Sequence, residues 1–157
     1  MMRKSIAPPK RPTVHAQEHW LDLERAATVE VTSEDKDFPI ESSLSIEPGQ
    51  GWRAAQPGIQ IIRLVFDEPQ KLKRVSLVFE EKEIKRTQEF VLRASLNSGG
   101  LFREILRQQW NFSAPTSTRE IEEYRVELQD IIAVELEIIP NISGGAAHAS
   151  LKSLRLA

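Results

Sequence analysis

The sequence predicts an all-β protein, folded as an antiparallel jelly-roll β-sandwich with one short helix near the N-terminus. Short runs along the chain alternate apolar with polar residues, a pattern typical of strands with one buried face. Turn-forming residues separate these runs about every 8 to 15 positions, which favours a sandwich over alternating strands and helices. The 157 residues are 40% hydrophobic and 28% charged, a balance that suits one domain with a buried core.

The clearest alternation lies between Gly51 and Phe79. Two runs in this stretch each place three large apolar side chains on one face: Ile62, Leu64 and Phe66, then Val75, Leu77 and Phe79. Pro69 lies between the runs, where its missing N–H would break no ladder of hydrogen bonds. We therefore expect two strands joined by a short turn at residues 68–70.

The N-terminal part of the chain divides into three segments. Residues 1–15 are basic and rich in proline, so we expect a disordered arm ahead of a single domain at 16–157. Residues 17–27 have apolar positions spaced for one side of a short helix. Residues 28–32 alternate, and we expect the first strand there.

Two segments further along fit either a helix or a strand. In residues 101–112 the apolar positions match both periods, and residues 119–128 combine strand-like alternation with a capping-box spacing just before them. Period alone does not decide between the two structures. The runs at 90–94 and 134–138 alternate clearly, and a short apolar run at 149–156 closes the chain.

Composition excludes several classes of protein. The chain has no cysteine, which excludes disulfides, thiolate metal sites and cysteine nucleophiles. The net charge of -2 disfavours a protein whose main task is to neutralise phosphates, so nucleic acid is an unfavoured partner. No apolar run approaches the roughly 18 residues of a membrane span, and the N-terminus lacks the apolar core of a signal peptide. We expect a cytoplasmic protein without a membrane partner.

No catalytic arrangement is evident either. His15, Glu18 and His19 match the H-x-x-E-H pattern of inverted zinc peptidases, but no third ligand accompanies them and they follow the proline-rich arm. We attribute the pattern to chance. His148 is the remaining histidine, and the sequence has neither a nucleophile elbow nor a glycine-rich phosphate loop. We therefore predict a protein that is not an enzyme and that uses no cofactor and no metal.

The order of signals in residues 27–157 resembles the discoidin, or factor V/VIII C-type, family, which has the galactose-binding-like jelly-roll fold. The matching stretches in chain order are ATVEVTS, GWRAA, IRLVFDEP, LKRVSL, QEFVLRASLNSGG and IAVELEIIP. The resemblance favours strands in both ambiguous segments. It implies a ligand site in the loops at one end of the sandwich, for a sugar in many members. The family's calcium-type loop is replaced here by Ile46–Gly51, so the resemblance implies no calcium site.

Five residues are candidate ligand contacts: Trp52, Arg53, Arg86, Asn111 and His148. The guanidinium of Arg53 would present a planar fork of donors to a carboxylate, a phosphate or sugar hydroxyls. Trp52 could instead fill the end of the core. Arg86 closes a charged loop, where the resemblance implies an arginine that donates to sugar hydroxyls and where the alternative is a solvated charge.

Two further candidates have structural alternatives. His148 is either a loop contact to the ligand or a structural or solvated histidine. Asn111 lies between Trp110 and Phe112, which share a strand face. These aromatic residues either belong to the core or stack on a sugar or a base.

The sequence thus favours a non-catalytic module that binds a carbohydrate or another polar ligand through its loops. The alternative is an adaptor of similar fold that binds a protein or a nucleic acid. The cytoplasmic character and the basic residues of the arm favour this second interpretation. A glycan array combined with a salt-dependent DNA-binding assay would distinguish the two.

Overall fold

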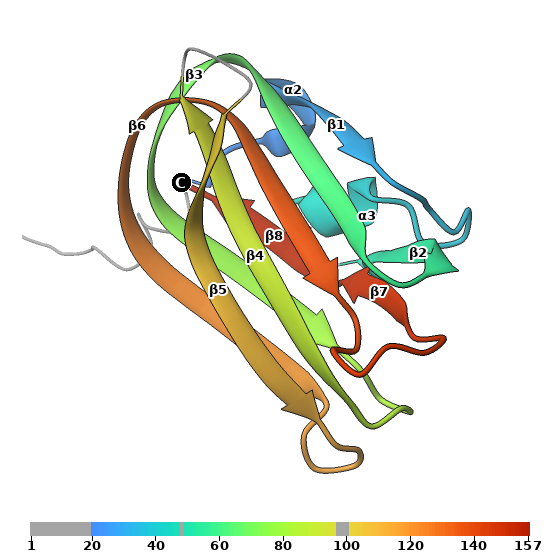
Figure 1. The fold of residues 1–157 in the computed structure, drawn as a ribbon. Helices are drawn as coiled ribbons and strands as arrows, with labels where there is room; N and C mark the ends of the chain where they lie inside the picture. Colours follow the sequence, from blue (N-terminus) through green and yellow to red (C-terminus); the bar gives the residue numbers. More distant parts are fainter. Residues whose placement is uncertain (1–19, 48, 97–100) are drawn as a thin grey trace, which may run out of the picture.

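A computed structural model describes residues 20–47, 49–96 and 101–157. The predicted arm and the H-x-x-E-H pattern lie outside the described residues. The structure is mainly β, with strands arranged in two facing layers (Figure 1). The strands within these described residues are β1 (Ala27–Val31), β2 (Trp52–Pro57), β3 (Gln60–Glu80), β4 (Arg86–Leu96), β5 (Phe102–Phe112), β6 (Arg119–Ile139), β7 (His148–Leu151) and β8 (Ser153–Leu156).

Every strand pair in the described part of the chain is antiparallel. The larger sheet has the order β1-β3-β6-β4-β5, and β8 pairs with β3 outside this path. Strands β2 and β7 form a separate two-stranded sheet. Both ambiguous segments are strands, β5 and the first half of β6, because their half-buried faces pack against the core. The predicted antiparallel sandwich is therefore confirmed.

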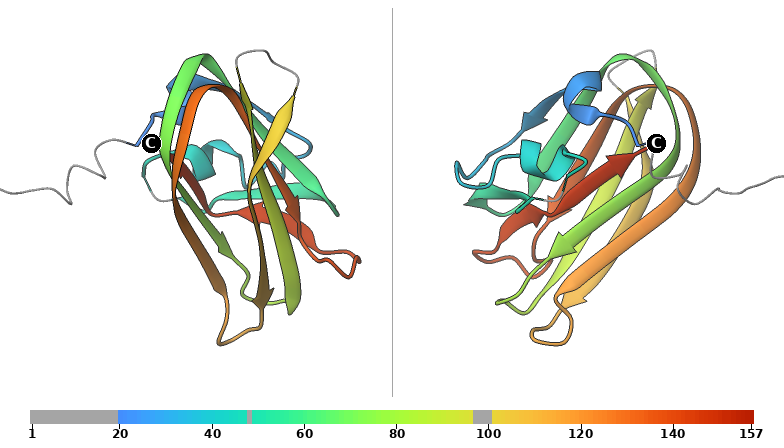
Figure 2. Two further views of the ribbon diagram at one scale, coloured as in Figure 1. Left: turned by 60° about the vertical axis from the view of Figure 1, so that its left-hand side comes forward. Right: turned by 180° about the vertical axis from the view of Figure 1, so that it is seen from behind.

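The predicted turn at residues 68–70 is wrong, because β3 continues without a break from Gln60 to Glu80. It pairs along its length with β6, and the two curved strands lie side by side in both views of Figure 2. The pairing register shifts between Val65 and Arg74. These irregularities bend the pair, as bulges do, and Pro69 lies within the irregular stretch.

The sequence carried a sign of this bend. The buried residues of β3 are even-numbered before it and mostly odd-numbered after it: Ile62, Leu64 and Phe66, then Val75, Leu77 and Phe79. Side chains alternate between the two faces of a strand, so this change of parity requires an irregularity in between. On β6, Asp130 has a φ of 56°, a left-handed conformation that aspartate tolerates better than most residues.

The helices are short. Of the helix predicted at 17–27, only α2 (Leu23–Ala26) is helical: residues 20–22 are not, Ala27 already belongs to β1, and residues 17–19 lie outside the described residues. A second helix, α3 (Glu41–Leu44), occupies a stretch with no clear sequence pattern. In the described part of the chain, neither helix has the length that a membrane crossing requires. Leu23 and Leu44 are both buried, so the two helices cover one side of the core.

Candidate functional site

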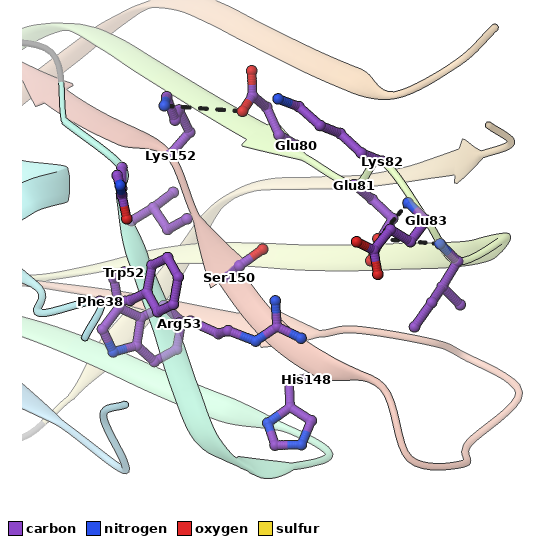
Figure 3. A pocket seen from close by; sticks show the side chains of 13 residues that line it. Phe38, Trp52, Arg53, Glu80, Glu81, Lys82, Glu83, His148, Ser150 and Lys152 are labelled. Atoms are coloured by element: carbon purple, nitrogen blue, oxygen red, sulfur yellow. Dashed lines mark hydrogen bonds and ion pairs between the residues drawn. The ribbon is translucent and has the colours of Figure 1, made fainter. Parts of the chain in front are cut away.

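A cleft of about 260 Å³ opens between the small β2–β7 sheet and the loop that follows β3 (Figure 3). One wall is made by residues of β2 and β7, and the other by residues 80–84. The polar or charged side chains that line it are Gln50, Arg53, Glu80, Glu81, Lys82, Glu83, His148, Ser150 and Lys152. The cleft therefore combines hydrogen-bond donors and acceptors in one concave surface.

The β2–β7 wall is held in place by a buried hydroxyl and a glycine. Ser43 Oγ donates to the carbonyl oxygen of Leu151 at 2.5 Å and accepts the Trp52 N–H at 2.7 Å. Gly51 has a φ of +89°, and a Cβ at this position would lie 2.6 Å from the Leu151 oxygen. Only glycine combines that backbone conformation with so close an approach. These contacts fix the register in which Arg53 lies opposite Ser150.

Trp52 and Arg53 point to opposite sides of β2, as successive strand residues must. Trp52 is 1% exposed, and its indole Nε1 donates to the carbonyl oxygen of Ser33 at 3.1 Å. It belongs to the core, although it also contributes to the cleft floor. Arg53 is exposed, and its guanidinium has no hydrogen-bond or ion-pair partner among the described residues. Its donors are therefore free for a ligand.

His148 lies beside Arg53 in the cleft (Figure 3). Its Nδ1 is 2.9 Å from the carbonyl oxygen of Ala54. A carbonyl oxygen can only accept, so Nδ1 carries the proton and donates. In the neutral ring, Nε2 is then left as an acceptor. The wall thus offers donors from Arg53 and an acceptor from His148.

The opposite wall is organised by Glu81. One carboxylate oxygen accepts from Arg86 Nε at 2.7 Å, and the other accepts the backbone N–H groups of Glu83 and Ile84. Burial by itself would raise the pKa of Glu81, but these hydrogen bonds bring the pKa below its usual value. The turn presents Lys82, Glu83 and Ile84 as exposed residues along the cleft.

Arg86 does not lie in a loop and is not solvated, contrary to the sequence-based alternative. It is the first residue of β4, and its side chain is 1% exposed. Its Nη1 donates to the carbonyl oxygen of Pro140 at 2.6 Å and to Gln88 Oε1 at 3.3 Å. The guanidinium also lies 4.9 Å from the centre of the Phe112 ring. Arg86 does not line the cleft, and its role as a ligand contact stays an untested prediction.

Asn111 also lies away from the cleft lining. It is exposed on β5, and its Oδ1 accepts from Thr87 Oγ1 at 2.5 Å. Of its two aromatic neighbours, Phe112 is fully buried and Trp110 is half-buried against the core. The structure therefore places both aromatic rings at the core, as the structural alternative expected.

The structure thus brings together Trp52, Arg53 and His148 and leaves Arg86 and Asn111 elsewhere. Sequence reasoning missed the charged residues of the opposite wall, Lys82 and Glu83. The charged run EEKEIKR showed that a loop was present, but only the fold shows that it faces β7.

The described residues contain no group of three or more histidine, aspartate or glutamate side chains arranged to hold a metal ion. The cleft residues can instead bind a small polyhydroxylated molecule. Arg53 can donate two parallel hydrogen bonds, while His148 and Glu83 can accept from hydroxyl groups. Phe38 and Ile84 add apolar surface for the carbon skeleton of such a ligand.

No family model and no curated protein matches the sequence. The fold does match solved structures. One is the family 32 carbohydrate-binding module of NanJ from Clostridium perfringens in complex with galactose, with a TM-score of 0.65, 12% identity, and coverage of 87% of this chain and 96% of that one. The chain has the galactose-binding-like fold. Two further carbohydrate-binding modules of known structure also match the fold.

The domain CpGH89CBM32-5 from Clostridium perfringens, in complex with GalNAc-β-1,3-galactose, matches with a TM-score of 0.60 and 17% identity. The match covers 87% of this chain and 98% of that one. The family 32 module of AlyQ, in complex with 4,5-unsaturated mannuronic acid, matches with a TM-score of 0.59 and 13% identity over 84% of this chain and 95% of that one.

Proposed function

We propose that this chain is a non-catalytic carbohydrate-binding module that takes one sugar residue in the cleft between β2, β7 and the loop after β3. The observation that carries the proposal is the exposed guanidinium of Arg53, without a partner among the described residues and beside His148 in a concave surface. The similar folds that hold galactose, a galactose-containing disaccharide and an unsaturated uronic acid support the same class of ligand.

The size of the cleft supports a small ligand. Its volume of about 260 Å³ is just under the roughly 300 Å³ at which pockets begin to enclose drug-sized molecules. We therefore expect a terminal monosaccharide to fill it, with the rest of a glycan outside. The cytoplasmic location stays a prediction, as does the absence of catalytic activity.

A glycan array followed by calorimetry on the best glycan tests this function. We expect Arg53→Met to weaken binding about tenfold or more, because it removes charge-assisted hydrogen bonds to the sugar. Arg103→Met is the matched control, since Arg103 is exposed on β5 and does not line the cleft. The control variant should bind as the unmodified protein does.

Two outcomes would contradict the proposal. Silence on the array, together with a specific protein captured in a pull-down, would favour the adaptor interpretation. Binding of a glycan that Arg53→Met and Arg103→Met weaken equally would move the sugar site away from the cleft.

A further inference from the structure

Arg53 differs from several other arginines of this fold because it has no carboxylate partner. Arg63, Arg93 and Arg107 each form an ion pair with a glutamate on a neighbouring strand. The side chains of Arg63 and Arg107 are 40% and 46% exposed, so contact with solvent does not prevent such pairs on this surface. Arg53 is likewise exposed, yet it forms no ion pair with any described residue. Its side chain extends from β2 into the cleft (Figure 3).

The charged side chains that line the cleft are divided unevenly between its two walls. Arg53 lies on β2 and Lys152 directly follows β7, and this wall contributes no acidic residue to the lining. The opposite wall, residues 80–84, contains all the glutamates of the lining together with Lys82. A negative group in the cleft is therefore attracted to the wall of Arg53 and repelled by the glutamates opposite.

Two of these glutamates already have cationic partners. Glu81 accepts from Arg86 Nε at 2.7 Å and from two backbone N–H groups. Glu80 lies 3.7 Å from Arg119 Nη1 and 3.9 Å from Lys152 Nζ. Arg86 and Arg119 do not line the cleft, so they compensate its acidic residues from outside.

The charges that remain leave the cleft positive. The lining carries three basic and three acidic side chains, and the two arginines outside it shift the balance toward positive charge. Lys82 and Glu83 are exposed, and their side chains form no ion pair with the described residues. Two cations, Arg53 and Lys82, thus face the single anion Glu83. A concave surface with such a balance attracts anions.

We infer that the sugar bound in this cleft carries a carboxylate, which Arg53 holds through two parallel hydrogen bonds. The inference rests on the carbohydrate-binding function proposed above and specifies its ligand as a sugar acid. The planar guanidinium matches the two coplanar oxygens of a carboxylate, whereas two hydroxyl groups of a sugar ring are neither coplanar nor charged. Hydrogen bonds between two charged groups are also roughly twice as strong as those between neutral groups.

The uneven walls orient this ligand. Its carboxylate lies against Arg53, because the other wall would place it beside Glu83. Its hydroxyl groups then face the acceptors of the cleft, the Glu83 carboxylate and Nε2 of His148 in its neutral ring. One sugar acid thus satisfies the basic wall and the acidic wall together.

The test compares uronic acids with their neutral counterparts, which have a hydroxymethyl group in place of the carboxylate. Galacturonic, glucuronic and mannuronic acid are titrated into the full chain beside galactose, glucose and mannose, all as methyl glycosides, and calorimetry measures the affinities. We expect the acid of at least one pair to bind about tenfold more tightly than the neutral sugar. The methyl ester of that acid should bind like the neutral sugar, because esterification removes the charge.

Substitutions in the cleft should change this preference for the acid. Arg53→Gln should abolish it, and Arg53→Lys should retain only part of it, because lysine keeps the charge and loses the planar fork. Glu83→Gln should increase it, because the variant removes the anion of the opposite wall. The control is Arg103→Gln, which makes the same change in net charge as Arg53→Gln. Arg103 is exposed without an ion pair to the described residues and lies outside the cleft, so the preference should not change.

The outcomes separate this inference from the proposed function. Equal affinity for an acid and its neutral sugar, with Arg53→Gln weakening both alike, would overturn the acidic ligand and leave a sugar-binding cleft. A preference for the acid that Arg53→Gln and Arg103→Gln change equally would refute the role of Arg53.

The glycan array decides the case in which none of the six monosaccharides binds. Array binding confined to glycans with a carboxylate, and lost in Arg53→Gln, would support the inference. Binding of neutral glycans would refute the acidic ligand alone, and a silent array would refute the proposed function with it.

Discussion

Two regions of the molecule each contain an arginine, and the surroundings of the two side chains differ. Arg53 lies in the cleft wall formed by β2 and β7, and Arg86 lies in the polar cluster at the start of β4. Arg53 is exposed and makes no side-chain hydrogen bond or ion pair with the described residues. Arg86 is 1% exposed, and Glu81, Gln88 and the Pro140 carbonyl oxygen all accept from it. The same residue type thus occurs in two different environments.

The difference follows from the cost of burying a charge. A guanidinium out of water is tolerated only where acceptors replace the lost solvent, and Arg86 has them from three segments of the chain. Arg53 keeps its water, which a ligand with paired oxygens can displace. Arg86 stabilises the fold, whereas Arg53 is available for recognition. The predictions below test this comparison, beginning with the largest expected effect.

The same substitution at the two arginines should separate their roles, and Arg86→Met should have the largest effect. It leaves the Glu81 carboxylate and the Pro140 carbonyl without their buried partner. We expect a loss of about 3–5 kcal/mol in the free energy of unfolding, measured by urea denaturation. A loss below about 1 kcal/mol would show that Arg86 is not needed for the fold.

Gly51→Ala should cause the next largest loss in the free energy of unfolding, because it disturbs the pairing of β2 with β7 next to Arg53. The new Cβ would meet backbone atoms at 2.6 and 2.9 Å in a residue with a φ of +89°. We expect a loss of about 3–4 kcal/mol, the sum of the left-handed backbone cost and the overpacking. Gly58→Ala is the control, with a φ of +87° but no atom within 4 Å of the Cβ, and should cost about 1–2 kcal/mol.

Equal losses of unfolding free energy in these two glycine variants would mean that the close approach of β2 to β7 does not contribute to stability.

The two glycine variants should also differ in glycan binding. Gly51→Ala should weaken glycan binding and Gly58→Ala should not, because only the first moves Arg53 relative to His148. Calorimetry on the glycan identified by the array measures both.

Glu120 belongs to the same polar cluster as Arg86. Its buried carboxyl group should make the stability of the fold depend on pH. Its side chain is fully buried, and Gln88 Nε2 donates to it at 3.1 Å. Burial, and then the neighbouring Glu122, raises the pKa of Glu120 from 4.5 to about 9. The folded state therefore holds a proton that the unfolded state releases. Its contribution to stability is complete below pH 4.5 and is lost as the pH rises to about 9.

Glu120→Gln should remove this dependence, because glutamine does not titrate and still accepts from Gln88. We expect the melting temperature of the variant to fall less between pH 5 and pH 9, and to exceed that of the unmodified protein at pH 8 by roughly 3 °C or more. Glu24→Gln, on the exposed face of α2, should leave the profile unchanged. Parallel profiles for Glu120→Gln and the unmodified protein would contradict the assignment.

Arg53→Met should have the smallest effect on stability, within about 0.5 kcal/mol, because no contact with a described residue is lost. The same urea denaturation that measures Arg86→Met checks it. A loss comparable to that of Arg86→Met would show that both arginines stabilise the fold. Unchanged stability together with lost glycan binding would support a ligand-binding role for Arg53 and a structural role for Arg86.

Part of the site could be predicted from the sequence because it depends on local alternation. Trp52 and Arg53 are neighbours on a strand, so one had to face the core if the other faced the cleft. The position of His148 beside Arg53 could not be predicted in the same way. It depends on the pairing of β2 with β7, nearly a hundred residues later in the chain.

The charged residues were the least predictable. Arg86 and Glu120 look like surface residues in the sequence, but their burial depends on partners that the fold supplies, such as the carbonyl of Pro140. Equally, nothing local indicates that Arg74 and Arg125 lie opposite each other, because the irregular pairing around the bend sets that register.

The sequence by itself determined several strands and their buried faces, such as the runs at 62–66 and 75–79, because the period of apolar residues encodes both. At residues 101–112 and 119–128 the period alone left helix and strand open. The resemblance of its signals to a known family then indicated the fold. Only the tertiary structure decided which charges are buried and paired and which remain free in a concave surface. The physical reason is that the cost of burying a charge depends on its partners, and here those partners come from distant parts of the chain.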